Sequence, residues 1–174
     1  MSENGTIKDH GHLKPEDISR DDYFMDICRV IGEKGTCDRG RSGCVIVKNN
    51  MILTTWFVTS PAGSPTCDEV GHQMKEIIHE DGHVSHHCMR NICAEQYAIT
   101  NATRLWIPLE GATLYSKMTP CNVRRCAHLI VACGIKRVVC DKIYHNAKES
   151  EEIFSRGGVE LVYLNKEEEK YPTI

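Results

Sequence analysis

Apolar residues near the start of the chain recur at the spacing of a helix. The positions that share this spacing are Ile18, Phe24, Ile27, Val30 and Ile31. They predict a first helix over residues 15–33. Two short apolar runs follow at 43–47 and 51–58, and an Asn-Asn pair at 49–50 separates them. This pattern predicts two strands joined by a tight turn.

The second half of the chain alternates between helical and strand-like patterns. We predict helices at 93–103, 126–133 and 150–156, and strands at 112–118, 136–140 and 159–164. A helix between successive strands favours parallel pairing of those strands. The sequence therefore predicts an α/β fold with three α/β/α layers and a mixed, mostly five-stranded sheet.

Three segments stand outside this pattern. Residues 1–14 are polar and without periodicity, which predicts a flexible N-terminal arm. Residues 166–174 read as a charged tail, so the domain itself is expected over 15–165. Residues 66–91 are rich in cysteine and histidine, and we expect them to form a partly helical excursion that packs over the candidate site.

Composition narrows the class of function. A chain of 174 residues fits one domain, and a net charge of −3 offers no basic field for a nucleic acid polymer. A small molecule is therefore the expected partner. The sequence shows no signal peptide and no membrane-spanning segment, so we predict a cytoplasmic protein. In that setting its ten cysteines favour metal binding or catalysis over disulfides.

Three cysteines and one glutamate form the strongest chemical pattern. They are Cys93 and Glu95 at a predicted helix start, Cys121 after a predicted strand, and Cys126 at the start of the next helix. Three thiolates can hold one zinc ion and leave its fourth position open to water, whose pKa the metal lowers. Glu95 is then the proton carrier rather than a ligand, as in zinc-dependent deaminases of nucleobases.

Several further motifs make the resemblance to one family specific. They are Ser60-Pro61-Ala62-Gly63, Cys67-Asp68-Glu69-Val70-Gly71, Cys93-Ala94-Glu95-Gln96, Thr119-Pro120-Cys121 and Gly134-Ile135-Lys136-Arg137-Val138-Val139. Together they resemble the deoxycytidylate deaminase family over roughly residues 22–164. The resemblance implies a cytidine deaminase-like fold, a catalytic zinc, and hydrolytic removal of the 4-amino group of a deoxycytidine nucleotide. It also implies a homo-oligomer, between a dimer and a hexamer.

The chain departs from the family at the predicted zinc site. Cys93 stands where the family usually has histidine, which makes the site one unit more negative. Arg124 and Arg125 lie in the same loop and either offset this charge or form a solvated loop. The family's Cys-x-x-Cys is two residues longer here, between Cys121 and Cys126. Residues five apart on one helix point about 140° apart, so Cys121 must lie in a loop, or the helix must bulge.

The predicted substrate pocket departs as well. Val58 stands where the family has an asparagine that contacts the sugar, and Tyr97 replaces a second asparagine. Tyr97 is therefore either a stacking residue for another base or part of the core. Arg39 and Arg41 are candidates for the nucleotide phosphate. Thr119 and Pro120 complete the candidate substrate-binding residues.

A second metal site is also expected. Its candidate ligands are Cys37, Cys67, His83, His86, His87 and Cys88, and some relatives carry a structural zinc. The leading hypothesis is a zinc-dependent deaminase of dCMP or a related pyrimidine. The alternatives are a deaminase with a modified substrate and a catalytically weak or inactive zinc- and nucleotide-binding relative.

Overall fold

A mixed sheet forms the centre of the computed structural model, which describes residues 14–79, 82 and 84–169. Most of the predicted arm and residues 170–174 of the predicted tail lie outside that part. The main strands are β1 (Gly43–Lys48), β2 (Met51–Phe57), β5 (Thr113–Met118), β6 (Arg137–Tyr144) and β7 (Glu160–Tyr163). They follow the order β2-β1-β5-β6-β7. β1 is antiparallel to β2 and β5, whereas β5, β6 and β7 are parallel. The predicted mixed sheet is confirmed.

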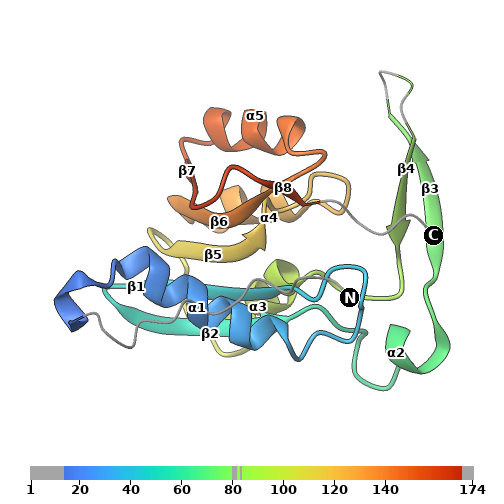
Figure 1. Ribbon diagram of the computed structural model, residues 1–174, viewed down its shortest axis with the longest axis horizontal. Coiled ribbons are helices and arrows are strands. Elements are labelled where there is room, and N and C mark those ends of the chain that lie inside the picture. Colours follow the sequence, from blue (N-terminus) through green and yellow to red (C-terminus); the bar gives the residue numbers. More distant parts are fainter. Residues whose placement is uncertain (1–13, 80–81, 83, 170–174) are drawn as a thin grey trace.

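Helices cover both faces of the sheet (Figure 1). They are the short η1 (Pro15–Asp17), α1 (Arg20–Gly32), α2 (Cys67–Val70), α3 (Ala94–Arg104), α4 (Cys126–Ala132) and α5 (Lys148–Arg156). α1 packs on β1 and β5, while α3 packs on β1 and β2. α5 contacts both α4 and β7. Among the described residues, none of these helices has the length and apolar character needed to cross a membrane.

Two buried cores follow from the alternation of side chains along β1. Val45 and Val47 join the core beneath α1, which includes Phe24. Cys44 and Ile46 point to the opposite face and join the core beneath α3, α4 and α5. Because neighbouring strand residues face opposite sides, a run of apolar residues is buried on both faces only in the middle layer of a three-layer fold.

The first predicted helix is divided in two. Pro15–Asp17 forms a single 3-10 turn, and α1 begins after Ser19. The Ser19 hydroxyl accepts a hydrogen bond from the backbone N–H of Asp22, which satisfies one of the free amides of the first helical turn. A capping residue inside the apolar pattern therefore restarts the helix.

The excursion at 66–91 is mainly a hairpin. Of its described residues only those of α2 are helical, and β3 (Met74–Ile78) pairs with β4 (Val84–Cys88) in a separate antiparallel ribbon. Figure 1 shows this hairpin standing beside the end of the main sheet. The exposed residues of β3 lack the buried stripe that stabilises a helix, so pairing with β4 decides their conformation.

The first part of the predicted tail also belongs to the fold. β8 (Glu168–Glu169) pairs in parallel with the end of β6. Oε1 of Glu169 lies 3.1 Å from Nζ of Lys117, and Oε2 lies 3.3 Å from Nζ of Lys142. Both lysine side chains are partly buried. These ion pairs explain why a charged segment that lacks apolar residues still follows the sheet.

Candidate active site and metal centres

Three helix or strand ends bring Cys93, Cys121 and Cys126 together. Cys93 is the residue before α3, Cys121 follows β5, and Cys126 is the first residue of α4. The sulfur of Cys121 lies 3.9 Å from that of Cys93 and 3.5 Å from that of Cys126. Amides at a helix start favour negative charge, so two helices support thiolates here.

A turn between Cys121 and Cys126 accommodates the two additional residues. The backbone N–H of Arg125 donates to the carbonyl of Asn122 at 2.6 Å, and Arg125 adopts the left-handed conformation with φ of 65°. α4 begins only after this turn. Cys121 therefore lies in a loop outside the helix, which is one of the two arrangements that the spacing allowed, and its sulfur lies close to that of Cys126.

The thiolate group has the dimensions of a zinc site. Sulfurs around a tetrahedral zinc, each about 2.3 Å from the metal, lie about 3.8 Å apart. The two sulfur–sulfur distances of 3.5 and 3.9 Å bracket this value. Interactions with the Cys126 and Cys93 side chains hold the pKa of Cys121 well below its ordinary value. The three residues fit a zinc ion in both spacing and donor chemistry.

Glu95 lies beside this group in the first turn of α3. Its side chain is buried, and the hydroxyl of Ser116 on β5 donates to its Oε1 at 2.6 Å. Burial raises the pKa of Glu95 to about 7, although the bond from Ser116 opposes the shift. A carboxyl group with a pKa near the working pH can both accept and return a proton.

A cavity opens in front of these residues. It is lined by Cys93, Glu95 and Cys121 from the thiolate side, and by His86, His87 and Cys88 from β4. Of the residues predicted to bind substrate, Arg39, Val58 and Thr119 line the cavity. His86, His87 and Cys88 form what we call the hairpin wall of the cavity. The sequence predicted that residues 66–91 pack over the site, but it offered these three residues as metal ligands rather than as cavity-lining residues.

Three other predicted substrate residues lie elsewhere among the described parts of the chain. Tyr97 stacks on Trp56 with ring centroids 5.3 Å apart, on the side where α3 covers β2. Arg41 donates to the carbonyl of Gly35, and Pro120 is fully buried. None of the three is among the residues that line this cavity. For Tyr97 the structure favours packing over a stacking role toward substrate.

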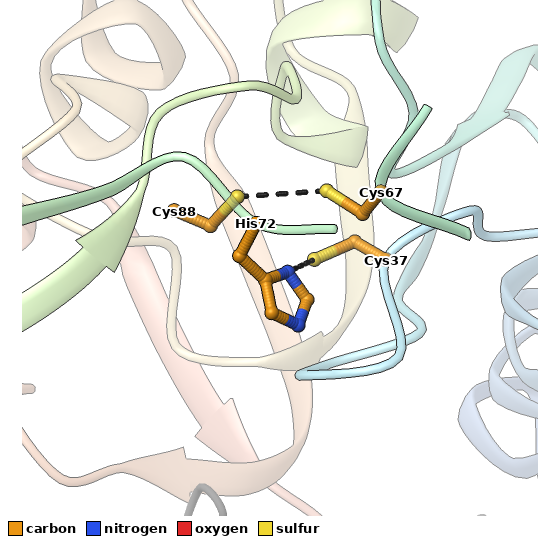
Figure 2. A group of neighbouring side chains, drawn as sticks. All are labelled: Cys37, Cys67, His72 and Cys88. Carbon is orange, nitrogen blue, oxygen red and sulfur yellow. Dashed lines mark hydrogen bonds between the residues drawn. The ribbon is translucent and has the colours of Figure 1, made fainter. Parts of the chain in front are cut away.

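A second group of possible ligands lies at the base of the hairpin (Figure 2). Its members are Cys37, Cys67, His72 and Cys88, whose donor atoms all lie within 4.8 Å of one another. The sulfurs of Cys67 and Cys88 are 3.5 Å apart, and the Cys37 sulfur lies 3.8 Å from Nδ1 of His72. Three sulfurs and one imidazole nitrogen form one of the usual donor sets of structural zinc.

Surrounding groups also suit a metal at this four-ligand cluster. Nε2 of His72 lies 3.1 Å from a carboxylate oxygen of Asp38, so the ring presents Nδ1 to the sulfurs. A carboxylate behind the imidazole is the usual second partner of a metal-binding histidine. Burial opposes ionisation of Cys88, but backbone amides of Arg90 and Gln73 lower its pKa to about 7.

The structure thus groups half of the residues that were predicted for a second metal. His87 instead bonds to the Ser85 hydroxyl at 2.7 Å and lines the cavity, while His86 is exposed on the same strand. His83 lies outside the described residues. His72 was missed as a ligand, although its place five residues after Cys67 and beside Gly71 was a usable signal.

Comparisons with known proteins point to one family. The family model for the cytidine and deoxycytidylate deaminase zinc-binding region matches residues 18–142. ComE operon protein 2 of Bacillus subtilis is 29% identical over 153 residues, covering 88% of this chain and 75% of the relative. The deoxycytidylate deaminase of Mycobacterium phage D29 is 32% identical over 125 residues, covering 70% of this chain and 94% of the relative.

A solved structure shares the fold. The dCMP deaminase from cyanophage S-TIM5, in complex with dCMP and dUMP, superposes with a TM-score of 0.67 at 23% identity. The match covers 88% of this chain and 100% of the cyanophage chain. At 23% identity the comparison shows a shared fold, and the shared region spans the whole of the cyanophage chain.

Proposed function

Because the chain belongs to the cytidine and deoxycytidylate deaminase family, a family of zinc-dependent hydrolytic deaminases, we propose that it deaminates dCMP or a closely related pyrimidine nucleotide. The observation that carries the proposal is the placement of buried Glu95 beside Cys93, Cys121 and Cys126 at the edge of a cavity. A carboxyl group held next to a three-thiolate group matches the division of roles between proton carrier and metal ligands.

The residues of the chain divide the work as follows. A zinc ion held by Cys93, Cys121 and Cys126 supplies an activated water when bound. Glu95 accepts a proton from water and delivers it to the ring nitrogen of the pyrimidine. Ser116 holds the Glu95 carboxyl in place through its hydrogen bond to Oε1. The hairpin wall around His87 limits the access of bulk solvent to the cavity.

Substrate contacts are part of the proposal. Arg39 lines the cavity and donates to the carbonyl of His86, so its guanidinium is near enough to meet a phosphate at the cavity mouth. Val58 would offer the sugar an apolar surface in place of an amide, so the pocket lacks a polar contact that would select a plain deoxycytidine nucleotide. A modified pyrimidine nucleotide is therefore the second candidate substrate.

Ammonia release from a panel of nucleotides tests the proposal. The panel contains dCMP, CMP, dCTP and 5-substituted dCMP, and each is incubated with zinc-loaded protein. We expect turnover of dCMP or its 5-substituted form, and none with Glu95→Ala at equal zinc content. Nucleotide binding without ammonia release from any member would support a non-catalytic binding protein instead.

We also propose that Cys37, Cys67, His72 and Cys88 hold a second, structural zinc. The support is the four-donor set and the Asp38 carboxylate behind His72. Metal analysis of the purified protein is expected to give two zinc ions per chain, falling to one in His72→Ala and in Cys121→Ser. One zinc in the wild-type protein that survives His72→Ala would exclude the second site.

Assembly and location extend the proposal. A homo-oligomer is supported by apolar residues on the surface, since Leu105 and Trp106 after α3 are 67% and 92% exposed. The cytoplasmic location stays a prediction from the sequence. Light scattering coupled to size exclusion measures the assembly, and Trp106→Ser is expected to weaken it if this surface is used.

A further inference from the structure

Arg124 lies between the thiolate group and the four-ligand cluster. Its guanidinium donates to the carbonyl of Cys88 at 3.2 Å and to Oδ1 of Asn91 at 2.7 Å, and also to the carbonyl of Asn91. On the other side, Arg124 lines the same cavity as Cys93 and Cys121. Gln96 on α3 holds the Arg124 carbonyl at 2.7 Å. Four hydrogen bonds therefore hold this side chain and its peptide in one position.

The charge of the thiolate group makes this position significant. One Zn²⁺ with three thiolates carries a net charge of −1, whereas one with two thiolates and a neutral histidine carries none. A net charge away from water is costly unless an opposite charge lies nearby. Arg124 is partly buried, and Cys93, Cys121 and Cys126 all act electrostatically on it.

We propose that Arg124 is a positioning residue whose positive charge balances the third thiolate, Cys93, and so stabilises the metal-loaded site. This inference rests on the proposed function, because it assumes that the site holds zinc. The turn between Cys121 and Cys126 then has a purpose beyond spacing, since its two additional residues bring an arginine to the group.

The four-ligand cluster holds the arginine in place. The Cys88 carbonyl that accepts from Arg124 belongs to a member of that cluster. Asn91, which accepts from Arg124, lies with its Nδ2 3.9 Å from the sulfur of Cys67, a second member. Ordering the cluster therefore orders the acceptors that hold the guanidinium beside the cavity lined by Cys93 and Cys121.

Zinc affinity measured against a chromophoric chelator tests the inference without any assay of deamination. The zinc assigned to the catalytic group is the one that Cys121→Ser removes. We expect Arg124→Gln to weaken this zinc by about 10- to 100-fold, the usual effect of losing an outer partner of a metal site. The control is Arg125→Gln, the exposed neighbouring residue, which should stay within about twofold.

A double-mutant cycle gives the sharper result. In a Cys93→His background the loaded site is neutral, so Arg124→Gln should weaken zinc by less than about threefold there. Arg124→Lys keeps the positive charge and replaces Arg124→Gln as the test variant if Arg124→Gln does not fold. Its zinc affinity should stay within about threefold of the wild type. The visible spectrum of the cobalt-substituted protein should still show thiolate-to-cobalt bands in each folded Arg124 variant.

Two results would overturn the inference. One is an Arg124→Gln effect no larger than that of Arg125→Gln. The other is a loss of zinc affinity on Arg124→Gln that is equally large in the wild-type and in the Cys93→His backgrounds. Failure of all variants to deaminate any nucleotide would count against the proposed function but would leave this measurement intact.

Discussion

At the scale of single residues, the site depends on polar groups held where water is scarce. Glu95 and Ser116 are both buried, and they are joined by the hydrogen bond at 2.6 Å. A buried carboxylate needs such a donor, because an unsatisfied charged oxygen in the interior costs about 1–3 kcal/mol or more. Ser116 therefore sets the position of the proton carrier.

Removing that donor should lower turnover. We expect Ser116→Ala to reduce kcat by about tenfold, because Glu95 loses a charge-assisted hydrogen bond of about 1.5 kcal/mol. Zinc content should not change, because a neutral serine hydroxyl is not one of the usual ligands of zinc. Steady-state kinetics with metal analysis measures both, and Ser155→Ala, at an exposed position on α5, is the control. An unchanged kcat would remove Ser116 from this role.

At the scale of elements, the four-ligand cluster lies at the base of the β3–β4 hairpin. Cys88 ends β4, and His72 precedes β3. The two strands pair with each other rather than with the main sheet. A two-stranded ribbon is marginal alone in water, so its order depends on what fastens it.

Loss of the cluster's metal should therefore loosen the hairpin. In His72→Ala we expect faster hydrogen exchange of amides at 74–78 and 84–88, while β1 and β5 in the main sheet stay protected. Cys121→Ser, which removes a ligand from the other group, should leave the hairpin protected. Exchange followed by mass spectrometry gives the comparison. Equal protection of the hairpin in His72→Ala and the wild type would show that other contacts fasten it.

At the scale of the whole molecule, one carboxylate joins the helical layer to the sheet. Arg137 of β6 donates to both oxygens of Asp21 at 2.8 Å, and the Tyr115 hydroxyl of β5 donates to one of them at 2.8 Å. The bonds from Arg137 hold the pKa of Asp21 below its ordinary value of 3.8, although burial opposes the shift. Folding therefore favours the ionised form.

The contribution of Asp21 to the stability of the fold depends on pH. The stabilisation from Asp21 is fully present above the unfolded pKa of 3.8 and is lost as pH falls below it toward the folded pKa. Asp21→Asn should lower the free energy of unfolding by about 1–3 kcal/mol at pH 7. The difference from the wild type should shrink below about pH 4.

Urea unfolding across pH measures this effect. Glu33→Gln, an exposed change at the end of the same helix, is the control and should stay within about 0.5 kcal/mol at each pH. A difference between Asp21→Asn and the wild type that stays constant down to pH 3 would contradict the assignment.

The sequence by itself determined the main elements and the chemistry of the thiolate group. The alternation after residue 93 is a local property of each segment, so it predicted helices α3, α4 and α5 and the parallel strands between them. For Cys121 the sequence left either a loop or a bulged helix, because five residues of regular helix would turn its sulfur away from Cys126; the structure has the loop. The family resemblance added the role of Glu95.

Only the tertiary structure decided which distant residues meet. The hairpin, the choice of His72 over His86 and His87, the Ser116 partner of Glu95, and the bonds of Arg124 all join segments far apart in sequence. A residue's type shows which bonds it can make, but its partners depend on how the layers pack. Periodicity describes neighbours along the chain, whereas the donor set of a metal site depends on distances across the fold.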